Sequence, residues 1–220
     1  MFIKINDLNI NYEEKGSGRP LIMIHGNGED LSIFNEASEV LKDHFKVYLI
    51  DSRDHGKSDK TKDIKYELMA DDVKEFIKQK DLDDVVFYGF SDGGIIGLLL
   101  CQNCDRVSRL IISGANITPN GVKANFRFLI KVLYFFTRDK KMELMLKEPH
   151  ISKEDLGKIK VKTTVIAGEK DLIYEEETKT IADNIENAKL LILPGEGHGS
   201  YIVHKTKIAD IIIDEVNSDN

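Results

Sequence analysis

A serine lies at the centre of a glycine-flanked turn, Gly89-Phe-Ser-Asp-Gly93. The turn follows the apolar residues 85–88 and precedes an apolar stretch that we expect to be helical to about Cys104. On a sharp strand-to-helix turn, a serine at position 91 projects above the sheet, and the flanking glycines remove Cβ atoms that would clash. Free N–H groups at the start of the helix favour negative charge. This context predicts a nucleophile at Ser91; the alternative is a serine that only caps the helix.

A serine hydroxyl requires a base before it attacks a carbonyl at neutral pH. His198 directly follows the region of a predicted strand, residues 189–193, and therefore lies at the sheet edge that carries Ser91. His55 is the rival base because it also follows a strand, but it lies upstream of the serine. The chain order therefore favours His198.

The base in turn requires a carboxylate that orients its ring. Asp171 follows the predicted strand at residues 163–167 and lies at the same edge of the sheet. Glu169 is the rival for this carboxylate, but it lies two residues nearer the strand, and its side chain is expected to point away from Asp171. We therefore prefer Asp171 as the partner of the His198 Nδ1–H group.

A second glycine-rich turn, His25-Gly-Asn-Gly28, follows the apolar residues 20–24. The backbone N–H of Asn27, together with that of Asp92 after the serine, is placed to form an oxyanion hole. For His25 itself we favour a structural role. The alternative for the whole turn is a plain connection between strand and helix.

Apolar segments of four to eight residues alternate with amphipathic ones along the chain. Such alternation predicts an α/β fold with a mostly parallel sheet of about eight strands, covered on both faces by helices. The first two strands are expected to be antiparallel. The expected strands are residues 2–5, 8–13, 20–24, 46–50, 85–88, 109–113, 163–167 and 189–193, and the last helix is expected from about 201 to 216.

One segment, residues 117–160, breaks the alternation and carries no strand signal. It is too long for a simple loop, and we interpret it as a helical lid inserted into a single domain of residues 1–220. Between residues 126 and 136, only Arg127 and Lys131 interrupt the apolar residues. A helix that is apolar nearly all round buries both sides, one against the sheet edge and the other in an acyl pocket or a second subunit. The predicted pocket residues are Phe128, Val132 and Phe135.

Composition excludes several classes of protein. The 220 residues carry a net charge of −7, so no basic surface for nucleic acid is expected. No apolar run reaches the length of a membrane span, and we expect a cytoplasmic protein. Cys101 and Cys104 have the C-x-x-C spacing, but we place them deep in a helix and interpret them as ordinary core residues, with no metal site or cofactor.

These motifs together resemble the α/β-hydrolase superfamily, and the resemblance covers essentially the whole chain. The matching segments are residues 25–28, 51–58, 89–94, 168–171 and 197–198, in that order. The resemblance implies a three-layer α/β-hydrolase fold with Ser91 as nucleophile, Asp171 as acid and His198 as base. It also implies the Asn27 and Asp92 amides as the oxyanion hole. The lid is shorter than in many members of the family.

The expected function is that of a serine hydrolase that cleaves a small carboxylic ester, thioester or amide through an acyl-enzyme on Ser91. The expected substrate carries a hydrophobic acyl or alcohol group. The same three residues also serve C–C bond hydrolysis, aminopeptidase action or acyl transfer to another acceptor. A third class is a non-catalytic receptor that retains only the fold.

Overall fold

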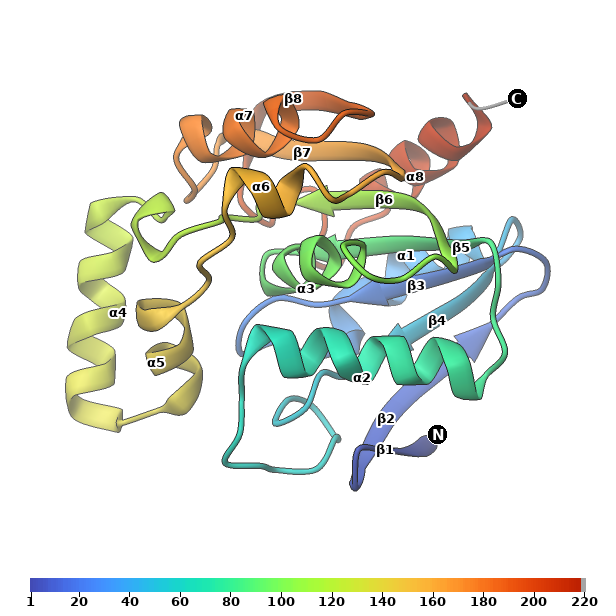
Figure 1. Cartoon of the computed structure of the whole chain (residues 1–220), viewed down its shortest axis with the longest axis horizontal. Helices are drawn as coiled ribbons and strands as arrows, with labels where there is room; N and C mark the ends of the chain where they lie inside the picture. Colours follow the sequence, from blue (N-terminus) through green and yellow to red (C-terminus); the bar gives the residue numbers. More distant parts are fainter. Residues whose placement is uncertain (219–220) are drawn as a thin grey trace.

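Eight strands form one sheet in the computed structural model, which describes residues 1–218 (Figure 1). Their order across the sheet is β1-β2-β4-β3-β5-β6-β7-β8. The β1–β2 and β2–β4 pairs are antiparallel, and all the other pairs are parallel. The strands are β1 Phe2–Ile5, β2 Leu8–Lys15, β3 Pro20–Ile24, β4 Lys46–Ile50, β5 Val85–Phe90, β6 Val107–Ser113, β7 Lys162–Lys170 and β8 Ala188–Gly197. The predicted fold class is confirmed.

Helices cover both faces of the sheet, which makes three layers (Figure 1). Successive side chains of a strand point to opposite faces. In β3, Ile22 and Ile24 therefore join one core and Leu21 and Met23 the other. The first core packs against α2 (Tyr66–Gln79), α3 (Asp92–Leu100) and α7 (Glu175–Asp183). The second packs against α1 (Asn35–Leu41), which follows the 3-10 turn η1 (Leu31–Phe34), and α8 (Lys207–Asn217).

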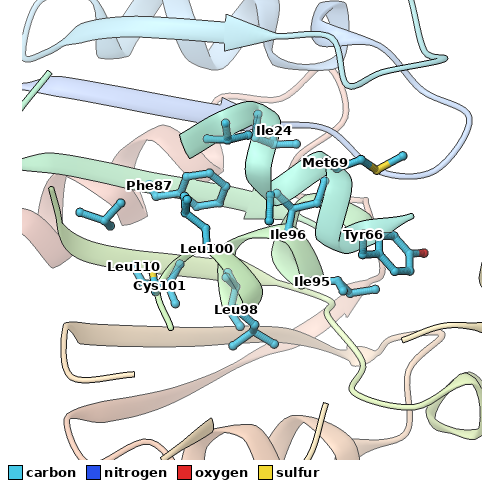
Figure 2. Close-up of a cluster of buried hydrophobic side chains, with 14 of the residues drawn as sticks. Ile24, Tyr66, Met69, Phe87, Ile95, Ile96, Leu98, Leu100, Cys101 and Leu110 are labelled. Carbon is cyan, nitrogen blue, oxygen red and sulfur yellow. The ribbon is translucent and has the colours of Figure 1, made fainter. Parts of the chain in front are cut away.

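The core beneath the serine turn is dense. Figure 2 shows Ile96 of α3 between Phe87 of β5 and Met69 of α2, with all three side chains almost completely buried. Each such side chain contributes roughly 1.5–3 kcal/mol relative to an exposed one. This packing fixes α3, and with it the turn that carries Ser91.

The segment between β6 and β7 is helical. It contains the 3-10 turn η2 (Pro119–Gly121), α4 (Ala124–Thr137), α5 (Lys140–Lys147) and α6 (Lys153–Leu156). Helices α4 and α5 stand beside the sheet, at the left of Figure 1. Within residues 1–218, no helix combines the length and apolar character needed to cross a membrane.

Two helix boundaries differ from the prediction. Helix α3 ends at Leu100, so Cys101 caps it and Cys104 lies beyond it, although both thiols are buried and free. The chain has to turn there to enter β6, and Asn103 and Asp105 are poor helix formers. The last helix begins at Lys207, because His204 adopts a left-handed backbone conformation with φ of 52°.

Candidate functional site

Ser91 occupies a strained turn between β5 and α3. Its backbone has φ of 52° and ψ of −112°, a conformation that residues other than glycine rarely adopt. The two flanking glycines permit this turn: a Cβ on Gly89 would lie 2.1 Å from the Gly93 oxygen, and one on Gly93 would lie 2.1 Å from the Ile24 oxygen. No larger residue fits at either position, so the sequence pattern is a steric requirement of the turn.

His198 follows the end of β8 directly, and its imidazole bridges the other two predicted residues. Its Nε2 lies 3.1 Å from Ser91 Oγ, and its Nδ1 lies 2.6 Å from Asp171 Oδ1. The ring packs against Phe90, with 5.0 Å between the ring centroids. The structure thus brings the residues that directly follow β5, β7 and β8 into one hydrogen-bonded chain.

Gly114 makes room for this imidazole. It follows β6, has φ of 63°, and a Cβ there would lie 2.7 Å from His198 Cε1 and 2.9 Å from Nδ1. Sequence reasoning missed this residue. The available signal was its place directly after a buried strand, at the edge where the other site residues lie.

Asp171 is buried and held by several donors. Its Oδ1 accepts a hydrogen bond from the Ile173 N–H at 3.0 Å, and its Oδ2 accepts one from the Gly168 N–H at 3.4 Å. Burial acts to raise the pKa of Asp171, but the contact with His198 and these N–H groups outweigh it and hold the pKa below its ordinary value. The carboxylate is therefore ionised where it meets the imidazole.

The two predicted oxyanion donors, the backbone amides of Asn27 and Asp92, belong to turns that a hydrogen bond links. The Asn27 side-chain amide donates to Asp92 Oδ2 at 2.9 Å, which links the turn after β3 to the start of α3. Asp92 is the first residue of α3, so its N–H has no acceptor within the helix. Gly26 lies against the serine, since a Cβ there would be 3.1 Å from Ser91 Cβ.

Asp92 itself is buried behind the serine. The Tyr66 hydroxyl donates to its Oδ1 at 2.9 Å. Burial raises the pKa of Asp92 to about 6, although the hydrogen bonds from Asn27 and Tyr66 oppose that shift. Each of the two Asp92 carboxylate oxygens thus accepts a hydrogen bond from the protein, one from Asn27 and one from Tyr66.

The rival residues lie elsewhere. Glu169 is exposed and accepts a hydrogen bond from the Gly195 N–H at 2.8 Å. His55 is buried beside His25, and its Nδ1 lies 2.9 Å from the Arg53 oxygen. His25 Nε2 accepts from the Ser52 N–H at 3.1 Å, which is the structural role expected for it.

An apolar cavity of about 240 Å³ opens in front of Ser91 and His198. Its walls come from the turn after β3, from the serine turn, and above all from α4 and α5. The lining residues are Gly26, Asn27, Glu29, Phe90, Ser91, Phe126, Leu129, Ile130, Leu133, Met142, Met145, Leu172 and His198.

The structure corrects the predicted pocket residues. Phe128, Val132 and Phe135 do not line this cavity; they lie on the exposed face of α4. The opposite face of the helix, with Phe126 and Ile130, lines the cavity instead. Because α4 is apolar on both sides, helical periodicity could not indicate which side faces the serine.

Glu29 is a cavity residue that the sequence did not reveal. Its Oε2 accepts the Gly26 N–H at 2.9 Å, and it shares the cavity wall with Ser91 and His198. Burial raises the pKa of Glu29, while the hydrogen bond from the Gly26 N–H opposes the shift. Its signal was its position just after the glycine-rich turn of residues 25–28.

Comparisons with known proteins agree with this architecture. The family model described as "alpha/beta hydrolase fold" matches residues 19–141. The AB hydrolase superfamily protein YisY of Bacillus subtilis is 27% identical, over 94% of each chain. A putative esterase/lipase of Haemophilus influenzae is 31% identical over 45% of this chain and 35% of its own. The solved esterase EaEST of Exiguobacterium antarcticum superposes with a TM-score of 0.85 at 24% identity, covering 98% of both chains. The chain therefore belongs to the alpha/beta hydrolase fold family.

Proposed function

We propose that this protein is a serine hydrolase that cleaves small carboxylic esters, thioesters or amides through an acyl-enzyme on Ser91. Esterase-like relatives support hydrolysis as the general activity. The observation that carries the specific proposal is the hydrogen-bonded chain from Ser91 through His198 to Asp171.

In the first half of the proposed reaction, Ser91 Oγ attacks the substrate carbonyl carbon while His198 Nε2 takes the hydroxyl proton. The Asp171 carboxylate stabilises the imidazolium and keeps the ring oriented. The Asn27 and Asp92 backbone amides hold the developing oxyanion, and each such donor typically contributes about 2.7–4 kcal/mol to transition-state stabilisation. His198 then gives its proton to the leaving alcohol, thiol or amine.

In the second half, water enters the position that the leaving group has vacated. The water oxygen attacks the acyl carbon while His198 takes a proton from the water. The tetrahedral intermediate collapses, the Ser91 oxygen recovers the proton, and the carboxylic acid leaves. Apart from the substrate and this water, the proposed steps use side chains and backbone amides of this chain.

The cavity supports a modest hydrophobic acyl or alcohol group. Aliphatic and aromatic side chains of α4 and α5 form most of its wall. Glu29 adds an acidic group beside the serine, which disfavours substrates with a carboxylate near the reacting carbonyl. Asp92 is engaged by Tyr66 and Asn27, so it is not free to bind a substrate amine.

A fluorophosphonate probe tests the proposal against a non-catalytic receptor. We expect covalent attachment at Ser91, located by mass spectrometry of the intact protein and its peptides. The label should be lost in Ser91→Ala and strongly slowed in His198→Ala. A protein that stays unlabelled while its circular dichroism spectrum shows a folded chain would contradict catalysis by Ser91.

A panel of substrates separates the proposed reaction from other uses of the same residues. We expect turnover of p-nitrophenyl butyrate to exceed turnover of aminoacyl p-nitroanilides. Faster consumption of the ester on addition of an alcohol, with a new ester as product, would instead assign acyl transfer.

A further inference from the structure

Helix α4 exposes an apolar face of which only Leu129 and Leu133 also line the cavity. Six of the nine exposed large hydrophobic side chains in the described chain belong to it: Phe128, Leu129, Val132, Leu133, Phe135 and Phe136. The three phenylalanines are 68%, 65% and 78% exposed. At 100° per residue these six side chains span an arc of about 160°. We propose that this face, together with the cations beside it, docks on an anionic lipid bilayer.

Cations border the apolar face. On the helical projection Lys131 lies about 40° beyond Phe135, at one edge of the arc, and Arg127 lies about a further 40° beyond Lys131. Arg127 donates to the side-chain oxygen of Asn120, a neutral partner. The Arg138 guanidinium lies 5.6 Å from the Phe135 ring centre. Within Ala124–Thr137 there is no acidic residue, although the whole chain carries a net charge of −7.

This combination is that of an interfacial helix. Apolar side chains enter the acyl boundary of a bilayer while neighbouring lysines and arginines meet anionic headgroups. The 14 residues of α4 give a length of roughly 21 Å, shorter than the hydrocarbon core, so the helix lies along the surface. In Figure 1, α4 stands at the outer edge of the molecule, where a flat surface can approach it.

The docking face adjoins the mouth of the cavity. Leu129 and Leu133 are both exposed and part of the cavity wall, so the apolar surface is continuous from the outer face to the interior. A docked protein therefore presents its cavity to the bilayer. This consequence rests on the proposed function, whereas the docking itself does not.

The charges favour a bilayer over a second copy of the chain. A two-fold dimer through α4 would bring the same face against itself, and with it the same cations. No carboxylate of α4 is available to pair with them. Anionic headgroups complement both the apolar arc and its charged border.

Sedimentation with vesicles tests the proposal. The probes are vesicles of phosphatidylcholine alone and of phosphatidylcholine mixed with phosphatidylglycerol. We expect binding to the mixed vesicles that weakens as salt is raised. The triple variant Phe128→Ser, Phe135→Ser, Phe136→Ser should bind at least about tenfold more weakly. Phe2→Ser, which removes a phenylalanine of similar exposure from β1, is the matched control and should bind as the wild type.

The double variant Arg127→Gln, Lys131→Gln isolates the charge. Its affinity for mixed vesicles should fall by about fivefold per cation, with no change on pure phosphatidylcholine. None of the changed residues lines the cavity, so all variants should hydrolyse a soluble ester as the wild type does. Equal binding of the wild type and the triple variant would overturn the proposal. A wild-type dimer that the triple variant dissociates, without vesicle binding, would assign the face to a second copy instead.

Discussion

Gly114→Ala should displace His198 without replacing any residue of the hydrogen-bonded chain. The new Cβ would lie 2.7 Å from His198 Cε1, whereas ordinary contacts begin at 3.4 Å. The imidazole would therefore have to move by about 0.7 Å. Moved by that amount away from the serine, Nε2 would lie about 3.8 Å from Ser91 Oγ instead of 3.1 Å, which is too far for a hydrogen bond.

The expected loss of activity follows from that displacement. Misplacing a reacting group by about 1 Å typically costs about 100-fold in rate, or roughly 2.7 kcal/mol. Alanine at a left-handed position also costs about 1–2 kcal/mol of folding stability. The stability cost alone does not lower the turnover of the folded fraction. Initial rates with p-nitrophenyl butyrate, normalised to folded protein, measure the effect.

Gly195→Ala separates the two contributions. Gly195 has φ of 76°, close to the 63° of Gly114, but no atom lies within 4 Å of the position that a Cβ would take there. Urea denaturation should show similar losses of stability for the two variants, while only Gly114→Ala loses about 100-fold in kcat/KM. Equal activities of the two variants would refute the argument that Gly114 positions the imidazole.

Three further substitutions have expected outcomes. Asp92 has a pKa of about 6 in the folded state against an ordinary 3.8. The folded chain therefore loses about 3 kcal/mol of stability as the pH rises through this window. Asp92→Asn should remove that loss, which urea denaturation at pH 4 and pH 7 measures. Glu29→Gln should raise kcat/KM for an ester with a terminal carboxylate about tenfold relative to a neutral ester of equal length. Met145→Trp narrows the cavity and should lower kcat/KM about tenfold for hexanoyl esters relative to acetyl esters.

Each of these expectations has a contrary result. A pH dependence of stability that is the same in Asp92→Asn and the wild type would mean that the carboxyl is not perturbed by burial. An unchanged preference between charged and neutral esters in Glu29→Gln would place the substrate away from Glu29. Equal losses for hexanoyl and acetyl esters in Met145→Trp would mean that the acyl chain does not enter this cavity.

The sequence predicted the parts of the site that lie at strand ends. Ser91, Asp171 and His198 each directly follow a strand of the parallel part of the sheet, and parallel strands bring their carboxyl ends to one edge. The sheet and the helical insertion could be predicted for the same reason, since alternating apolar segments have few other ways to bury themselves.

The remaining features depend on contacts between distant segments. Gly114 matters only because the His198 ring packs on it, and Glu29 matters only because its carboxylate turns back to the Gly26 N–H. The face of α4 was assigned wrongly because both of its sides are apolar, one toward the cavity and one toward solvent. Local sequence patterns do not carry these relationships.

The central claim is that Ser91 and His198 act as one unit, and a double-mutant cycle tests it most directly. The measurement is kcat/KM for p-nitrophenyl butyrate in Ser91→Ala, His198→Ala and the double variant. Residues that act together show strongly non-additive losses. We therefore expect each single substitution to cost nearly as much as both together. Losses that multiply in the double variant, or a Ser91→Ala protein that retains wild-type turnover, would contradict the account.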